Sequence, residues 1–155
     1  MWTDFEIGYL SGMIDGEGSI YIQYRMEGSC KNFFPRIQIV NTNQEVIEWI
    51  KNKFGGNIVY RNRNKVNPKW KDSYEWYTTR ESLDQLIPLL IPHLIIKKQH
   101  AIIIQEFRKT FTGKAGGRRV TPAFQAIREE CYQKLKQLNH RGPLLSSPVS
   151  PSALR

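Results

Sequence analysis

Two acidic residues, Asp15 and Glu17, flank Gly16 directly after an apolar segment that begins at Leu10. We expect both carboxylates at the C-terminal end of a helix, where the helix dipole disfavours negative charge. A cation or a set of hydrogen-bond donors must then offset them, and a bound divalent metal would serve. The competing interpretation of Asp-Gly-Glu-Gly is a solvated turn between a helix and a strand, since Asp and Gly commonly form turns.

The helix that positions these acids has a clear start. Thr3 followed by Glu6 fits a capping box, and no proline interrupts Phe5 to Ile14. Gly8 and Gly12 lie on one face of this helix. A glycine in a helix interior costs about 0.8–1 kcal/mol relative to alanine, so we expect a close approach at these positions, with a second helix as its partner.

After Gly18 the sequence alternates with the period of strands. Ile20 and Ile22 alternate with polar residues, and Ile37 and Ile39 do the same further along. We predict four strands of one antiparallel sheet, over residues 19–25, 33–40, 58–65 and 74–79, with a loop over 26–32. In the fourth strand we expect Trp76 to point inward.

The remaining elements are predicted to be helices, which makes the order of elements α+β. A capping box at Thr42 to Glu45 starts a helix that runs to Gly55. Further helices are expected over 82–94 with proline interruptions, over 97–112, and from Thr121-Pro122 to about Leu138. We predict one domain over residues 1–140 and a flexible tail over 141–155, rich in Gly, Pro and Ser and dispensable for catalysis.

The charge of the chain favours a nucleic-acid partner. The 155 residues carry a net charge of +9, which argues for a polyanion or an acidic membrane surface. Between Lys51 and Lys71 there are seven Lys or Arg and no acid, with Tyr60 and Trp70 among them. Membrane-binding segments instead pair basic residues with a broad apolar face, so we expect no membrane partner.

Other segments exclude several classes of protein. The apolar stretch over 86–96 is broken by prolines and is too short for a membrane span, and the N-terminus does not resemble a signal peptide. Cys30 and Cys131 have neither metal-ligand spacing nor disulfide density, which favours a reducing, intracellular location. The three histidines form no zinc pattern.

The polar face of the predicted sheet carries side chains that can read base edges. Arg pairs bidentately with guanine and Gln with adenine, each good pair contributing about 1–3 kcal/mol of discrimination. The alternative is an ordinary polar solvent face. The residues that we expect to contact DNA are Tyr21, Gln23, Arg25, Phe34, Arg36, Gln38, Arg61, Arg63, Lys65, Glu75 and Tyr77. Lys114, Arg118 and Arg119 lie in a Gly-rich segment that suits phosphate contacts, or that is a plain linker.

The run Leu10 to Gly18, Leu-Ser-Gly-Met-Ile-Asp-Gly-Glu-Gly, resembles the signature of the LAGLIDADG homing endonucleases, with substitutions at the second, fourth, seventh and eighth places. The resemblance extends over Phe5 to Phe111 and includes the strand after the motif, Asn41 and Glu45 at the start of a second helix, and the lysine between Leu94 and His100. It implies a LAGLIDADG-type fold, in which a four-stranded antiparallel DNA-binding sheet is backed by helices.

The resemblance also implies roles for individual residues. Glu17 matches the metal ligand at the eighth motif position, where aspartate is commoner, and the Gly16 carbonyl would be a further ligand. Lys97 matches the basic residue near the scissile phosphate, with Lys98 as its neighbour one position away. Asn41 matches the polar residue that positions active-site water. Asp15 is expected to help tie down the helix end.

One carboxylate loop is too little for phosphodiester hydrolysis, which often uses two metals. Because the chain has a single motif, a twofold homodimer is the economical solution, and the resemblance implies the same. We expect its interface at Gly8, Leu10, Ser11, Gly12 and Asp15. The family resemblance further implies an intron-encoded enzyme with Mg²⁺ as its metal, replaceable by Mn²⁺, and with Ca²⁺ binding without efficient cleavage.

A twofold homodimer would read a long, pseudo-palindromic double-stranded DNA site and, as the resemblance implies, cut both strands to leave short 3′ overhangs. Two alternatives stay open. One is a maturase that binds intron RNA on the same scaffold, and the other is a DNA-binding protein that keeps the motif for helix packing. The resemblance places the chain in an archaeal cytoplasm or an organelle without deciding between them.

Overall fold

The structure, a computed structural model, describes residues 1–111 and 120–139 of the chain. Over these residues it is an α+β fold whose four strands form one antiparallel sheet in the order β1-β2-β4-β3, which confirms the predicted fold class. The elements are α1 (Asp4–Glu17), β1 (Gly18–Glu27), β2 (Cys30–Asn41), α2 (Gln44–Phe54), β3 (Asn57–Arg61), β4 (Ser73–Tyr77), α3 (Arg80–Leu90), α4 (Lys98–Arg108) and α5 (Pro122–Leu138).

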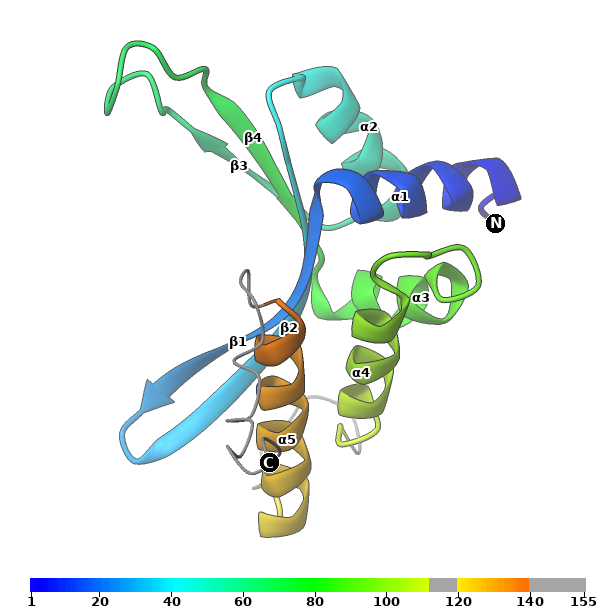
Figure 1. The fold of residues 1–155 in the computed structure, drawn as a ribbon, viewed down its shortest axis with the longest axis vertical. Coiled ribbons are helices and arrows are strands. Elements are labelled where there is room, and N and C mark those ends of the chain that lie inside the picture. The colour runs from blue at the N-terminus through cyan, green and yellow to red at the C-terminus, as the bar shows by residue number, and fades with distance from the viewer. Residues whose placement is uncertain (112–119, 140–155) are drawn as a thin grey trace, which may run out of the picture.

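The sheet has two arms that diverge in space. The β1–β2 pair reaches toward the lower left of Figure 1 and the β3–β4 pair toward the upper left, while α1, α3 and α4 lie to the right of the strands. Helix α5 packs against α4 and β1. The helices therefore support the middle of the sheet, and α5 also packs along the first arm, where the Gln125 side chain donates to the Lys31 carbonyl at 2.9 Å.

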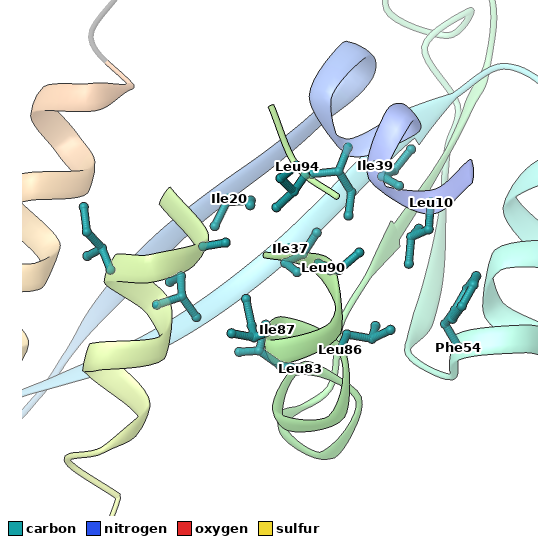
Figure 2. Packing of buried hydrophobic residues seen from close by; sticks show 14 of the residues in the cluster. Leu10, Ile20, Ile37, Ile39, Phe54, Leu83, Leu86, Ile87, Leu90 and Leu94 are labelled. Atoms are coloured by element: carbon teal, nitrogen blue, oxygen red, sulfur yellow. The ribbon is translucent and has the colours of Figure 1, made fainter. Parts of the chain in front are cut away.

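The inward face of the sheet builds the core. Ile20, Ile37 and Ile39 are fully buried and pack with Leu10 of α1 and with the leucines of α3 (Figure 2). Trp76 is also fully buried, as predicted, and its indole Nε1 donates to the Gly55 carbonyl at 2.8 Å. This bond satisfies the polar edge of the ring, so the largest core side chain leaves no unpaired donor.

The third strand is shorter than predicted and ends at Arg61 rather than at residue 65. The reason is that side chains take the backbone N–H groups that a strand would pair. The Asn64 N–H donates to Asp72 Oδ1 at 3.0 Å, and the Lys65 N–H donates to Asn62 Oδ1 at 3.2 Å. Residues 62–72 therefore form a turned loop between β3 and β4.

The first hairpin differs in the opposite direction, because its strands extend through most of the predicted loop. Glu27 pairs with Cys30, so only Gly28 and Ser29 form the turn. Gly28 has φ of 60°, in the left-handed region that glycine tolerates best. The first arm of the sheet is consequently longer than the sequence indicated.

Several helix boundaries also differ from the predictions. Helix α1 continues to Glu17, so both motif acids lie within its last turn. Asn43, not Thr42, caps α2, because its side chain accepts from the Val46 N–H and no capping box forms. Helix α3 runs over Arg80–Leu90, two residues earlier at its start and four at its end than predicted. Among the described residues no helix is long and apolar enough to span a membrane.

Candidate active site and nucleic-acid interface

The Glu17 side chain is held at the C-terminal end of α1 by a residue from the sheet. Asn41, the last residue of β2, donates from Nδ2 to Glu17 Oε2 at 2.6 Å. Its own Oδ1 accepts from the Asn43 N–H at 2.8 Å. Both ends of the amide are therefore engaged, and Glu17 is exposed to solvent with its carboxylate oriented.

Asp15 fixes the loop that carries Lys97. Its carboxylate accepts three backbone N–H groups, from the consecutive residues 95–97, at 2.7–3.1 Å. The Lys97 ammonium donates in return to the Asp15 carbonyl at 2.6 Å. Helix α1 has no basic residue in its last turn, so the Lys97 charge is the one that complements this end of the helix dipole.

The environment shifts the pKa of both partners. Partial burial raises the pKa of Asp15, but the backbone N–H groups of Ile95, Lys97 and Ile96 outweigh burial, and the net pKa lies below its ordinary value. Burial lowers the pKa of Lys97, with the Asp15 charge acting in the opposite direction. Asp15 is therefore ionised throughout the physiological range, and Lys97 is a partly buried cation beside the helix end.

The fold brings three of the predicted site residues to one place. Glu17, Asn41 and Lys97 come from α1, the end of β2 and the residue before α4, and each contacts the last turn of α1 or a side chain on it. Lys97 rather than the exposed Lys98 makes the contact with Asp15. The backbone of Ile95 and Ile96 was missed, because no local signal links it to a residue 80 positions earlier.

The described residues of one chain supply few metal ligands at this place. They contain no group of three or more His, Cys, Asp or Glu side chains placed to hold a metal. Glu17 offers a carboxylate, and the Gly16 carbonyl lies in the last helical turn, where carbonyls lack an intrahelical donor. These are oxygen donors, the kind that Mg²⁺ prefers, but they are too few to surround it.

The glycine face of α1 is open. Apart from the neighbouring residues and the helix's own backbone, no atom of the described residues lies within 4 Å of where a Cβ would project from Gly8, Gly12 or Gly16. Two of the predicted interface residues, Leu10 and Ser11, are instead buried inside this chain, where they are 0% and 1% exposed. Leu10 packs in the core, and the Ser11 hydroxyl donates to the Ile7 carbonyl at 2.8 Å.

Large apolar side chains are exposed near both ends of this face. Phe5 is 76% exposed near the start of α1. Ile95 and Ile96, whose backbone is bound to Asp15, are 86% and 70% exposed. Such side chains beside a bare helix backbone are typical of a protein interface.

The outward face of the sheet carries an organised set of polar and aromatic side chains. Tyr21 pairs with Arg36, and Gln38 with Tyr77, so the predicted residues of β1, β2 and β4 share one face. The Tyr21 hydroxyl donates to Gln38 Oε1 at 2.6 Å, and burial is the main cause that raises its pKa. The register adds Val40 and Val59, opposite Glu75, which sequence reasoning missed because valine is not a base-reading residue.

Further contacts hold the long cations of this face in place. The Arg36 guanidinium carbon lies 4.8 Å from the centre of the Tyr77 ring, and that of Arg25 lies 5.7 Å from the centre of the Phe34 ring. Arg61 donates to Glu75 at 2.8 Å. Such packing reduces the rotamer freedom that binding a partner would otherwise remove.

Two of the predicted DNA contacts lie off the strands of the sheet. Arg63 and Lys65 are exposed in the loop between β3 and β4 rather than on a strand face, as the shorter third strand requires. Lys114 and Arg118 lie outside the described residues, as does the predicted tail over 141–155. The loop residues remain close to the second arm of the sheet.

Comparison with solved structures identifies relatives of this fold. The homing endonuclease I-CvuI, solved in complex with a DNA target, superposes with a TM-score of 0.73 at 16% identity, covering 90% of this chain and 85% of that chain. The archaeal intron-encoded homing endonuclease I-Vdi141I, complexed with DNA, gives 0.72 at 22% identity, covering 90% and 87%. The group I intron-encoded I-CeuI gives 0.52 at 12% identity, covering 84% and 78%.

These identities are low enough that the superpositions establish the fold alone. No curated protein sequence matches the chain. The sequence model of the LAGLIDADG endonucleases matches residues 10–111, which include the motif, the whole sheet and the helices up to α4. The chain therefore belongs to the LAGLIDADG endonuclease family.

Proposed function

We propose that this protein is a metal-dependent, site-specific DNA endonuclease that acts as a homodimer. The observation that carries the proposal is the convergence of Glu17, Asn41 and Lys97 on the last turn of α1. A carboxylate, an amide and a partly buried cation suit a reaction that needs a metal ligand, a group that orients water and a charge near a phosphate.

Mg²⁺ is the metal we propose, held by Glu17 and the Gly16 carbonyl, with Mn²⁺ as a substitute and Ca²⁺ as an ion that binds without efficient cleavage. When bound, the metal activates water and stabilises the charge on the leaving oxygen. Asn41 fixes the orientation of the Glu17 carboxylate. Lys97 provides positive charge at the phosphate, and Asp15 positions it through the backbone of residues 95–97.

The second copy of the chain follows from the shortage of ligands. One chain offers a single exposed carboxylate at this place, so two α1 helices crossing at Gly8 and Gly12 would bring two Glu17 side chains together. The exposed Ile95, Ile96 and Phe5 would be covered in the same interface. Twofold symmetry then implies a pseudo-palindromic site, read by the outward face of two sheets and cut to leave short 3′ overhangs.

Cleavage of a randomised duplex library in Mg²⁺, followed by sequencing of the new ends, tests the activity. We expect double-strand ends at one pseudo-palindromic site, absent with Glu17→Gln and absent when Ca²⁺ replaces Mg²⁺. A folded dimer that binds duplex DNA without cutting it would instead be a DNA-binding protein. One that retains intron RNA and promotes splicing would be a maturase.

Adding bulk to the glycine face tests the dimer separately. Within one chain a Cβ at Gly12 would have no described atom within 4 Å apart from the helix's own backbone, so we expect Gly12→Leu to fold normally yet block the helix crossing. Sedimentation should show a dimer for the unmodified chain and a monomer, inactive in cleavage, for Gly12→Leu. Ala126→Leu, at an exposed position of α5, is the matched control and should remain dimeric. A Gly12→Leu dimer with full activity would contradict this interface.

A further inference from the structure

Three arginines from three helices meet around one aromatic ring at the far end of the helical layer. Arg80 begins α3, Arg108 ends α4, and Arg128 lies in α5. Their guanidinium carbons lie 4.6, 4.3 and 4.3 Å from the centre of the Phe111 ring. We name Arg80, Arg108 and Arg128 the arginine cluster.

Two of the three arginines are largely removed from water, whereas Arg80 is exposed at the rim. Arg128 is 8% exposed, and the Arg108 side chain is 13% exposed. Arg128 donates from Nε to Thr110 Oγ1 at 2.8 Å and from one Nη to the Thr110 carbonyl at 3.2 Å. These bonds use two of the five guanidinium N–H groups, so one edge of Arg128 is fixed and further donors remain for another acceptor.

The negative charge near the cluster does not balance it. Among the described residues, the one ion pair made by the three arginines is that of Arg108 with Asp84. Hydrogen bonds from its own backbone N–H and from Thr79 lower the pKa of Glu81, and the charges of Arg80 and Arg108 lower it further, so this second carboxylate also lies near the cluster. Burial, followed by the charges of Arg108 and Arg80, lowers the pKa of Arg128, which means that the three cations repel one another.

The three arginines face two carboxylates, Asp84 and Glu81, so the cluster keeps a positive charge, and the buried Arg128 has no carboxylate partner among the described residues. Guanidinium groups bind phosphate oxygens through parallel N–H bonds, and several together surround an oxyanion. We propose that Arg80, Arg108 and Arg128 form a binding site for a phosphate group. The site lies at the opposite end of α4 from Lys97, about 16 Å away along the helix, and is distinct from the sheet face.

Inorganic phosphate is the first probe, with thermal unfolding of the full chain as the readout. Phosphate at 10 mM should raise Tm by about 3 °C more than NaCl of equal ionic strength, as expected for a site of millimolar affinity. Arg80 is exposed at the rim of the cluster, so Arg80→Gln should fold normally and lose at least half of this increment. Lys134→Gln, which removes an exposed charge of α5 paired with Glu130, is the matched control and should keep it.

A variant with the opposite expected sign separates binding from a structural role. Asp84 competes for Arg108, so Asp84→Asn should lower Tm in NaCl yet increase the stabilisation by phosphate. A purely structural ion pair predicts the loss of Tm without the stronger phosphate response. Equal stabilisation of all four proteins by phosphate would be a general salt effect and would overturn the proposal.

The phosphate can come from solution or from a nucleic-acid backbone, and a single-stranded oligonucleotide distinguishes the two sources. If the cluster binds a backbone phosphate, Arg80→Gln should weaken oligonucleotide binding relative to Lys134→Gln and reduce the salt slope by about 1. If it binds free phosphate, the two variants should bind the oligonucleotide alike while only Arg80→Gln loses the Tm increment. Both patterns support the site.

Discussion

Acidic side chains at the two ends of α1 are stabilised in different ways. At the N-terminal end the Glu6 carboxylate accepts the Thr3 N–H at 2.9 Å, while the Glu6 N–H donates to Thr3 Oγ1 at 3.2 Å. Here the helix dipole favours the acid. At the C-terminal end Asp15 and Glu17 oppose the dipole, and donors from residues 41 and 95–97 hold them.

The start of α1 therefore contributes to stability, whereas the end of α1 carries the candidate functional groups. At the start of α1, the side chains of Thr3 and Glu6 each accept the backbone N–H of the other residue, and Glu6 also forms an ion pair with Lys53. The end of α1 is electrostatically unfavourable when taken alone, and the fold offsets it with distant groups. Acidic side chains retained at such a place are typical of functional sites, where local preferences are violated and offset elsewhere.

The largest expected effect comes from replacing one glutamate at each end of α1 by glutamine. Glu17→Gln should reduce cleavage at least 100-fold, more than the 10–100-fold typical of a partner outside the metal shell. Its Tm should change little, because Glu17 is exposed and glutamine keeps an acceptor for Asn41. Glu6→Gln removes the same charge at the other end and should leave single-turnover cleavage unchanged. Equal activity of the two variants would remove Glu17 from the metal site.

The same difference between local and distant contacts determines which features the sequence could predict. The start of α1, the hairpin face of β1 and β2, and the inward Trp76 depend on neighbours within a few residues, and all were predicted correctly. The end of β3 at Arg61 was not, because Asp72 competes for backbone donors across the loop. Leu10 and Ser11 were placed at an interface because periodicity alone does not show which stripe of α1 the core occupies.

For the candidate site, the sequence could predict residue types but not their contacts. Glu17, Asn41 and Lys97 came from a motif and its family resemblance, whereas their meeting at one helix end required the fold. The arginine cluster had no signal at all, since Arg80, Arg108 and Arg128 are separated by long segments and belong to three helices. Long-range electrostatics is therefore the part that sequence patterns could not supply.

The next largest effect tests whether Asp15 stabilises the fold rather than the reaction. Asp15→Asn replaces one acceptor oxygen by an amide that faces a backbone donor from residues 95–97, which should cost about 1.5–3 kcal/mol. Thermal unfolding should show a fall in Tm of about 4–10 °C. Asp4→Asn, in the first turn of the same helix, is the control and should change Tm far less. If Asp15→Asn and Asp4→Asn unfold at the same Tm, Asp15 does not anchor the loop.

A smaller effect compares the cap of α1 with the two candidates for the cap of α2. Thr3→Ala should destabilise the protein by about 1 kcal/mol, because the Glu6 N–H loses its acceptor. Asn43→Ala should cost a similar amount, whereas Thr42→Ala should cost almost nothing, since Asn43 makes the cap bond to Val46. Chemical denaturation of the three variants measures this directly. A larger loss for Thr42→Ala than for Asn43→Ala would restore the cap predicted from sequence.

The smallest effect is a pH dependence at the N-terminal end. The hydrogen bond from Lys53, followed by that from the Thr3 backbone, lowers the pKa of Glu6 from 4.5 to about 2. A carboxyl group whose pKa is lower in the folded state stabilises the fold at pH values above its unfolded-state pKa. This stabilisation is lost as the pH falls through the folded-state pKa. The Tm difference between the unmodified chain and Glu6→Gln should therefore be constant above pH 5, shrink between about 4.5 and 2, and vanish below.

Because Glu6 and Lys53 form an ion pair near the surface, the difference should also decrease in high salt. Lys53→Met should shift the loss of this difference to higher pH, since it removes the main cause of the lowered pKa. A difference that persists unchanged at pH 2 would mean that Glu6 acts through packing rather than through its charge.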